Sequence, residues 1–391
     1  MKTADAIVIG AGINGSTTAY HLRQRGVKNV VLIEKSLIAS GGTGDSAAIV
    51  RQHYSHEALI KLVKRSVEVF RNFDDIIGGD PDYHRTGWAF LVPEHAAEAF
   101  DRNISLQQSL GVNTRQITID DLHEIEPRIQ VPDVGRIAWE EESGYCEPKN
   151  SVVHAYVRRF MDMGGTLLDN TTVTGLNVQN GRMSSVQIGC EAISAPTVVV
   201  AAGPWSAQIA AWAGIELPIE ITREQEFIIE TGPCGGPPAM PFSDFAQSIY
   251  YRPHTGTRTL LGRGYPKDYE SIVDPDYYVQ HADGWFIDEV LERFGRRFPT
   301  LNGALAVHGF SGLYDVTPDW NPVLGRIDQV EGLILCCGFS GHGFKIGPAI
   351  GECMAEYITE GASSLIDISV FDIRRFAIGA PLRNAYGGNR A

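Results

Sequence analysis

Short, fully apolar runs flank an amphipathic stretch at the N-terminal end of the chain. Ala6–Ile9 and Val30–Ile33 contain apolar residues only, which is typical of strands buried on both faces of a parallel sheet. Between them, Ile13–Arg25 has helical spacing, and Gly26 follows as a helix-ending residue. The pattern therefore predicts one strand–helix–strand unit with its two strands parallel.

Two kinds of pattern alternate along the rest of the chain. Buried apolar runs return at 197–202 and 333–337, and they resemble the strands of the first unit. From 218 to 298 the pattern is mainly that of strands, and the runs 248–252 and 259–262 flank a short turn, as in a hairpin. The order predicts an α/β domain that is interrupted twice by a strand-rich second domain.

The length of 391 residues favours two domains over one. We predict an α/β fold (α+β overall) in which the first domain is discontinuous and the second is mostly antiparallel. A loosely attached tail is expected from about Asp372. The predicted boundaries are 1–85, 145–215 and 305–375 for the first domain, 86–144 and 216–304 for the second, and 376–391 for the tail.

Composition narrows the range of partners. With 33 basic and 47 acidic residues the formal net charge is −14, and no block of Lys and Arg stands out. Nucleic acid and anionic membrane surfaces are therefore poor candidate partners. The chain has no apolar run of the length that a membrane-spanning helix needs, so no membrane span is expected.

The six cysteines are scattered and form no CxxC pair, so neither a metal site nor a redox dithiol is indicated. Cys336 and Cys337 are adjacent in an apolar run and are expected to be buried strand residues. A reducing compartment fits this usage better than an oxidising one. The chain passes from Lys2 directly into a strand without a signal-peptide pattern, so we expect a cytoplasmic protein.

A dinucleotide-binding fingerprint of the form GxGxxG lies between the first strand and its helix. Its residues are Gly10, Ala11, Gly12, Ile13, Asn14 and Gly15. Gly10 permits the tight turn, Gly12 lets the backbone approach a pyrophosphate, and Gly15 allows close packing of helix on strand. The N-terminus of the helix offers N–H donors and a positive dipole end to the phosphates.

Glu34 ends the second strand, 19 residues after Gly15. A carboxylate there accepts hydrogen bonds from ribose hydroxyls and disfavours a 2′-phosphate. A GxGxxG string alone is weak evidence, but strand, helix and spaced acid together make an accidental glycine-rich turn a poor explanation. The fingerprint does not separate NAD from FAD. Its place at the start of the chain and the discontinuous domain favour FAD.

Four segments of the chain resemble the FAD-dependent amine and amino-acid oxidoreductases of the D-amino-acid-oxidase superfamily. The segments are Ile7–Glu34, Gly41–Tyr54, Val198–Trp205 and Gly338–Lys345, and the last, GFSGHGFK, is the most specific. The sarcosine oxidase, dimethylglycine dehydrogenase and proline/opine dehydrogenase branch is the most similar. The resemblance implies a glutathione-reductase-like Rossmann FAD domain and a mostly antiparallel substrate domain.

The resemblance also implies which residues hold FAD. Backbone N–H groups near the start of the last helix are expected to face the pyrimidine edge of the flavin, where they stabilise the negative charge of the reduced ring. Besides the fingerprint and Glu34, the expected cofactor residues are Lys35, Gly41, Gly42, Thr43, Ser46, Val173, Ala202, Gly203, Trp205, Gly341, His342, Gly343, Phe344 and Lys345.

By the same resemblance the substrate is a small carboxylate that carries a secondary or tertiary amine. Arg51 and Lys345 match the carboxylate-binding residues of the family, and a guanidinium fork suits both carboxylate oxygens. From the residues alone, half of a surface or interdomain ion pair is the better interpretation of Arg51, and only the family motif reverses it. Lys345 could equally be a solvated lysine at the start of a helix. His342 is either a satisfied loop histidine or a residue that acts near the flavin. In the hairpin we expect Tyr251 rather than Tyr250 to face the substrate.

The chain departs from the family at positions that bear on cofactor and acceptor. Relatives with a covalent flavin carry Cys where this chain has Gly312, or His where it has Ser46, so we expect non-covalent FAD. The histidine that attaches an additional FMN in heteromeric relatives is not clearly matched, which disfavours FMN. The strand at 259–263 lacks the lysine that activates oxygen in single-chain sarcosine oxidases. Oxygen and a carrier protein both remain open as electron acceptors.

The resemblance implies oxidation by hydride transfer from the C–H next to nitrogen to N5 of FAD, giving an imine that hydrolyses. The amine must be neutral to release hydride, and the sequence shows no obvious general base. Two alternatives stay open. The first is a flavin-carrying β-subunit of a heteromeric amine dehydrogenase that needs partner subunits. The second is an NAD-dependent dehydrogenase, and the GFSGHGFK segment disfavours this second alternative.

Overall fold

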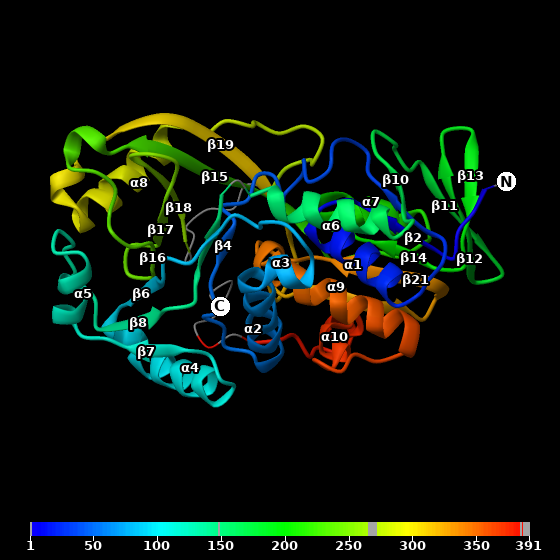
Figure 1. Ribbon diagram of the computed structural model, residues 1–391, viewed down its shortest axis with the longest axis horizontal. Coiled ribbons are helices and arrows are strands. Elements are labelled where there is room, and N and C mark those ends of the chain that lie inside the picture. Colours follow the sequence, from blue (N-terminus) through cyan, green and yellow to red (C-terminus); the bar gives the residue numbers. More distant parts are fainter. Residues whose placement is uncertain (1, 148, 265–271, 384, 386–391) are drawn as a thin grey trace.

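The computed structural model describes residues 2–147, 149–264, 272–383 and 385. Two large sheets occupy the two ends of an elongated molecule (Figure 1). A small third sheet consists of β4 (Ile49–Val50), β5 (Tyr83–His84) and β9 (Gly144–Cys146).

The centre of the ten-stranded sheet is parallel and fully buried. β2 (Ala6–Ile9) pairs in parallel with β3 (Val30–Ile33) on one side and with β14 (Val198–Val200) on the other. β14 pairs in parallel with β21 (Val330–Cys337), and α1 (Ile13–Gln24) makes the first crossover. The predicted strand–helix–strand unit and the later apolar strands are thus confirmed.

Several helices, α1 among them, cover one face of this sheet (Figure 1). α9 (Gly343–Glu360) packs with α1 in one apolar core, and Gly361, at a φ of 88°, ends α9. α7 (Ser206–Ala211) contributes to the apolar core on the opposite face. The helices α2 (Glu57–Arg71), α3 (Phe73–Ile76) and α6 (Ser151–Asp162) share the core of α1, whereas α10 (Arg374–Ala377) packs Phe376 against the core of the opposite face.

The outer strands of this sheet extend it on both sides. They are β1 (Lys2–Thr3), β10 (Thr166–Leu168), β11 (Gly175–Gln179), β12 (Arg182–Ile188), β13 (Glu191–Ser194) and β20 (Val323–Ile327).

The second sheet has eight strands in the order β19-β15-β18-β17-β16-β6-β8-β7, and all its pairs are antiparallel except β16 with β6. β17 and β18 form the expected hairpin. The strands are β6 (Trp88–Val92), β7 (Thr114–Gln116), β8 (Arg136–Glu140), β15 (Glu220–Glu230), β16 (Phe242–Asp244), β17 (Ile249–Pro253), β18 (Arg258–Arg263) and β19 (Leu305–Val316).

One helix in this region corrects the prediction of strands up to residue 298. α8 (Gly284–Arg297) buries Phe286, Val290 and Phe294 against the eight-stranded sheet. These residues are spaced by four, so they fall on one face of a helix, and that periodicity outweighs the strand pattern of the neighbouring segments. The remaining helices of this part are α4 (Ala97–Ser109) and α5 (Ile119–Ile125).

The two large sheets agree with the predicted α/β fold, in which the second part is mostly antiparallel. The domain boundaries themselves stay a prediction. A division along the sheets would assign β19 to the second domain, although the predicted third segment of the first domain begins at 305.

The segment after Asp372 is not loosely attached where the structure describes it. Arg375 is buried and its guanidinium donates to both carboxylate oxygens of Asp319, at 2.7 and 2.9 Å. Residues 384 and 386–391 of the predicted tail lie outside the described residues.

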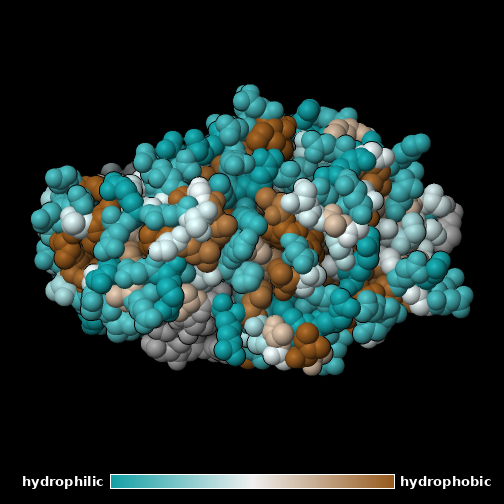
Figure 2. Space-filling view, turned by 90° about the horizontal axis from the view of Figure 1, so that it is seen from below, coloured by the Kyte–Doolittle hydropathy of each residue, from teal (hydrophilic) through white to brown (hydrophobic). Residues whose placement is uncertain are grey.

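Among the described residues, no helix combines the length and the apolar character needed to cross a bilayer. On the face shown in Figure 2, apolar side chains are interspersed with hydrophilic ones over the whole length of the molecule.

Candidate active site

The turn after β2 has a backbone that only glycine fits. Gly10 has a φ of 104°, and a Cβ there would lie 2.4 Å from the Ala201 carbonyl oxygen. A Cβ at Gly15 would lie 1.9 Å from the carbonyl oxygen of Gly10. These contacts hold α1 against the ends of β2 and β14, and they place the helix N-terminus at the edge of the sheet.

Glu34 is held at the adjoining edge by the backbone. One carboxylate oxygen accepts from the N–H of Ala11 at 2.8 Å, and the other accepts from the N–H of Ser36 at 3.0 Å. Ala11 therefore acts on the cofactor site by fixing Glu34, while both carboxylate oxygens keep lone pairs for a ligand.

A cavity of about 850 Å³ opens at this edge of the sheet. Its size lies within the usual range for ligand and cofactor sites. Seventeen of the expected cofactor residues line it: Gly10, Gly12, Ile13, Asn14, Glu34, Lys35, Gly41, Gly42, Thr43, Ser46, Val173, Ala202, Gly203, Trp205, Gly341, Gly343 and Phe344. Ala11 and Gly15 do not line this cavity but position residues that do. His342 and Lys345 line a second cavity instead.

The wall of this cavity suits a dinucleotide. Gly12 caps α1 without a side chain, which leaves first-turn N–H groups for phosphate, and the Ile13 N–H donates to Thr43 Oγ1 at 3.1 Å. The buried Asn14 Oδ1 has no hydrogen-bond partner among the described residues. A ligand with phosphate, ribose and amide groups would satisfy these atoms, so the residues present fit FAD.

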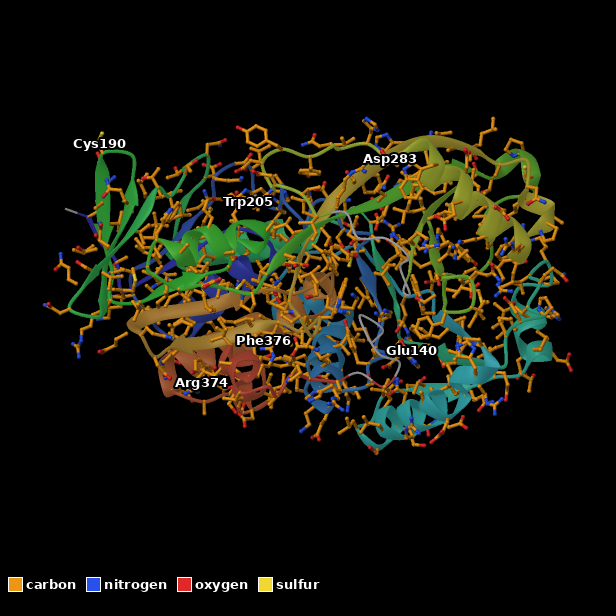
Figure 3. The ribbon with its side chains drawn as sticks, turned by 180° about the vertical axis from the view of Figure 1, so that it is seen from behind. Glu140, Cys190, Trp205, Asp283, Arg374 and Phe376 are labelled. Carbon is orange, nitrogen blue, oxygen red and sulfur yellow. The ribbon has the colours of Figure 1, made fainter. Side chains whose placement is uncertain are left out.

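Lys35 and Trp205 form one rim of the cavity together with a residue that the sequence did not indicate. The Lys35 ammonium lies 3.4 Å from the centre of the Trp205 ring. Asp276 accepts from the Trp205 indole at 2.8 Å and from Lys35 at 3.1 Å. Figure 3 shows Trp205 near the middle of the molecule, whereas Cys190 lies at its far end.

A second, smaller cavity of about 120 Å³ adjoins the first. Ser46, Tyr314 and Gly341 line both cavities, so the two meet at these residues. Arg51 and Lys345 belong to the wall of the smaller cavity, as the resemblance implied for a substrate site.

The smaller cavity contains two basic side chains that have no carboxylate partner among the described residues. Arg51 donates to the carbonyl of His53 at 2.7 Å, and Lys345 to the carbonyl of Gly341 at 3.4 Å. Within the part of the chain that the structure describes, neither forms an ion pair with a carboxylate. Burial, and then the Arg51 charge, holds the pKa of Lys345 well below its usual range. An anionic ligand would relieve this repulsion.

His342 also lines the smaller cavity. Its Nδ1 hydrogen-bonds the hydroxyl of the buried Tyr54 at 2.9 Å. Burial lowers the pKa of His342 far below its usual value, and the charges of Lys345 and Arg51 lower it further. The imidazole is therefore neutral in the free protein.

His53 lines neither cavity, and its backbone carbonyl accepts the hydrogen bond from Arg51. Its ring stacks on Phe90 at 4.3 Å between centroids, and burial lowers its pKa to about 3. The Glu140 carboxylate lies 3.8 Å away and accepts from the N–H of Gln52 at 2.7 Å. Glu140 lies on the eight-stranded sheet (Figure 3). This packing supports the backbone that carries Arg51.

The expectation for the hairpin tyrosines is wrong. Tyr251 is fully buried in the core of the second sheet, with its ring 4.1 Å from that of Phe242, and its hydroxyl donates to the Met240 carbonyl. Tyr250 lines the smaller cavity instead. The alternation of the strand placed the two tyrosines on opposite faces, but which face looks inward depends on how the sheet packs.

Acidic residues of the wall were also missed. Asp45 and Glu226 line the larger cavity, and burial raises the pKa of Asp45 to about 6. A signal was present for Glu226, because it is a carboxylate beside the apolar residues Phe227–Ile229 of a strand.

Comparisons with known proteins agree with this geometry. Residues 5–357 match the family model described as FAD dependent oxidoreductase, and the chain belongs to that family. A structure of L-proline dehydrogenase from P. horikoshii has a TM-score of 0.88 and 30% identity, and the match covers 97% of this chain and all of that one.

Two sequence relatives show the range of the family. Sarcosine oxidase subunit beta of Rhodobacter capsulatus is 26% identical over 97% of this chain and 90% of that protein. The mitochondrial sarcosine dehydrogenase of Mus musculus is 25% identical over 96% of this chain, which spans 42% of that protein. The chain is thus an enzyme, an FAD-dependent oxidoreductase whose relatives oxidise amines, and the cofactor is FAD rather than NAD.

Proposed function

We propose that this enzyme oxidises a small secondary or tertiary amine carboxylate at the C–H bond next to nitrogen. The observation that carries the proposal is the pair of cations, Arg51 and Lys345, in a small cavity that opens on the cofactor cavity. Two adjacent positive charges without a carboxylate partner among the described residues favour a carboxylate ligand. The size of the cavity favours a ligand no larger than a small amino acid.

The chain's own residues bind and orient this substrate. The Arg51 fork would take both carboxylate oxygens and Lys345 would add a point charge, which fixes the neighbouring carbon and nitrogen. The shared wall at Ser46, Tyr314 and Gly341 directs that carbon towards the larger cavity. FAD held by the residues of the larger cavity would supply the two-electron oxidant for this C–H bond. The imine product then hydrolyses.

The names of several relatives support an amine carboxylate. They include 4-methylaminobutanoate oxidase of Paenarthrobacter nicotinovorans, at 25% identity over 95% of this chain, besides the sarcosine and proline enzymes above. Which amine carboxylate this chain uses, and whether oxygen or a carrier protein accepts the electrons, stay predictions for experiment.

Anaerobic flavin reduction tests the proposal. The purified yellow protein is mixed with sarcosine, L-proline, glycine or an opine while the flavin absorbance near 450 nm is followed. At least one of these compounds should bleach the flavin. If none does, the substrate class is wrong. Acid precipitation of the same protein should release the flavin, because Gly312 and Ser46 offer no side chain of the kind that links it covalently.

A second candidate is a β-subunit of a heteromeric amine dehydrogenase. It is favoured by the full-length similarity to a sarcosine oxidase subunit beta. Size-exclusion chromatography of the protein purified from its native cells distinguishes the two cases. Stoichiometric co-elution of other chains, with flavin reduction that needs them, would support the subunit.

A further inference from the structure

Three strands of the second sheet bring a tyrosine and a carboxylate together across a glycine. In the ladder, Glu226 of β15 is opposite Gly262 of β18, and Gly262 is opposite Tyr250 of β17. A Cβ at Gly262 would lie 2.3 Å from the Cζ and Oη atoms of Tyr250. The tyrosine ring therefore crosses the strand where no side chain stands, and its hydroxyl donates to Glu226 Oε1 at 2.5 Å.

This pair connects the two cavities. Tyr250 lines the smaller one, beside Arg51 and Lys345, and Glu226 lines the larger one. Glu226 is only 6% exposed, and its second carboxylate oxygen, Oε2, has no hydrogen-bond partner among the described residues. A buried carboxylate with a free oxygen is costly as an anion and has room for a proton.

We propose that Tyr250 and Glu226 form a proton relay that deprotonates the substrate's ammonium group before oxidation, an inference that rests on the proposed function. The ammonium N–H passes its proton to Tyr250 Oη while the phenol's own proton passes to Glu226 Oε1. One N–H and one O–H bond break, and one phenol O–H and one carboxyl O–H bond form. The amine nitrogen is left with the free lone pair that hydride release requires.

The electrostatics of the pair suit these roles. Burial raises the pKa of Glu226, and the Tyr250 hydrogen bond and nearby cations oppose that shift. Burial keeps the pKa of Tyr250 far above its usual value, so the phenol transmits a proton and does not hold a negative charge. The charged or titratable groups that act on Glu226 or Tyr250 include Asp45, Lys149, Glu224, Arg252 and Tyr314. Arg51, Asp244, Arg263, His342 and Lys345 line the same cavity as Tyr250.

Arg51, Lys345 and Tyr250 line the same cavity, so a substrate held by the two basic side chains would have its amine in the cavity that Tyr250 lines. Arg51 and Lys345 would hold the carboxylate, and in an α-amino acid one carbon separates the carboxylate from the nitrogen. Because the cavity is about 120 Å³, its walls lie close to any ligand that fills it. The relay thus supplies the general base that the sequence pattern did not reveal.

The test is the pH dependence of anaerobic flavin reduction in the FAD-loaded wild type, Glu226→Gln and Tyr250→Phe, with sarcosine and L-proline as probes. Glutamine still accepts a hydrogen bond but cannot take a proton, and phenylalanine cannot transmit one. Near pH 7 each variant should reduce its flavin roughly 100-fold more slowly than the wild type. Near pH 10, where solvent deprotonates the amine, all three rates should converge. The double variant should be no slower than either single variant.

Glu230→Gln is the matched control, because Glu230 lies on the same strand outside both cavities and should leave the pH profile unchanged. A merely structural role of the pair would lower the rate by one factor at every pH, and either that result or unshifted profiles would overturn the relay. FAD content and the apparent affinity for L-proline are measured for each variant. If Glu226→Gln loses FAD, the pH profile of Tyr250→Phe alone decides whether the relay exists, because this variant removes one oxygen atom and leaves the carboxylate in place. A wild type that no amine carboxylate bleaches would contradict the proposed function itself.

Discussion

The two cavities of this enzyme are built in different ways. At its fingerprint end, the cofactor cavity depends on the backbone of one continuous turn, where Gly10 and Gly15 allow α1 to approach the sheet and the Ala11 N–H holds Glu34. The smaller cavity, which we propose as the substrate cavity, depends on side chains that come from separate parts of the chain, such as Arg51, Tyr250 and Lys345.

The comparison shows which kind of site tolerates substitution. A site made of backbone groups fails when a side chain is added, because the chain cannot adopt the same path. A site made of side chains fails when a functional group is removed. The loss of affinity or rate then depends on the strength of the interaction that was removed. The following substitutions test this difference.

Substitution of Gly15 by Ala should have the largest effect. The new Cβ would overlap the Gly10 carbonyl oxygen, so α1 must move away from the phosphate position. Overpacking strain of about 1–3 kcal/mol corresponds to roughly 5- to 150-fold weaker FAD binding. The FAD-to-protein ratio from the absorbance spectrum measures it. Gly284→Ala is the control, because a Cβ there meets no atom within 4 Å. A fully loaded Gly15→Ala protein would contradict the backbone account.

Arg51 tests the substrate cavity without touching the cofactor. Arg51→Met removes a charge-assisted bidentate contact, and loss of about 2–3 kcal/mol predicts a Kd for L-proline or sarcosine raised roughly 30- to 150-fold. Arg51→Lys keeps the charge but loses the fork, so its loss should be smaller, about tenfold. Both Kd values come from the saturation of anaerobic flavin reduction. Unchanged binding with normal FAD content would remove Arg51 from the site.

Lys345 should make anion binding depend on pH. Because burial and Arg51 lower its pKa, the lysine is neutral above that lowered value and must take up a proton to pair with a carboxylate. Affinity for 2-furoate, an unoxidisable carboxylate without an amine, should therefore fall as pH rises through that pKa, by at most about tenfold per pH unit. Flavin spectral shifts report binding. Lys345→Met should bind more weakly and lose this dependence; a retained dependence would assign it to another group.

The hairpin tyrosines give the smallest expected effect. Tyr251→Phe removes a buried hydrogen bond to the Met240 carbonyl, which should lower the free energy of unfolding by about 1 kcal/mol. Flavin reduction should be unchanged, in contrast to Tyr250→Phe. Urea unfolding and stopped-flow reduction of the two variants measure both effects. Slower reduction in Tyr251→Phe with unchanged stability would reverse the assignment of the two faces.

The glycine turn and Glu34 of the cofactor site were predictable because these residues are local in sequence, whereas the other cofactor residues were expected only from the family resemblance. Strand, glycine turn, helix and acid follow one another within residues 6–34, so spacing alone implies their geometry. Arg51 and Lys345 were expected to bind the substrate only because of a family resemblance, since nothing local marks a solitary Arg or Lys as a ligand. Helix α8 was missed although Phe286, Val290 and Phe294 carry its period, because the surrounding segments have strand patterns.

By itself the sequence determined the parallel strands, the glycine turn with its acid and the hairpin, since each follows from short-range sterics and periodicity. Only the tertiary structure decided that Tyr250 rather than Tyr251 lines the smaller cavity, and that Glu226 lies within reach of it across Gly262. The physical reason is that alternation separates the two faces of a strand but does not say which face is buried. That choice depends on the register of several strands and on the helices packed against them.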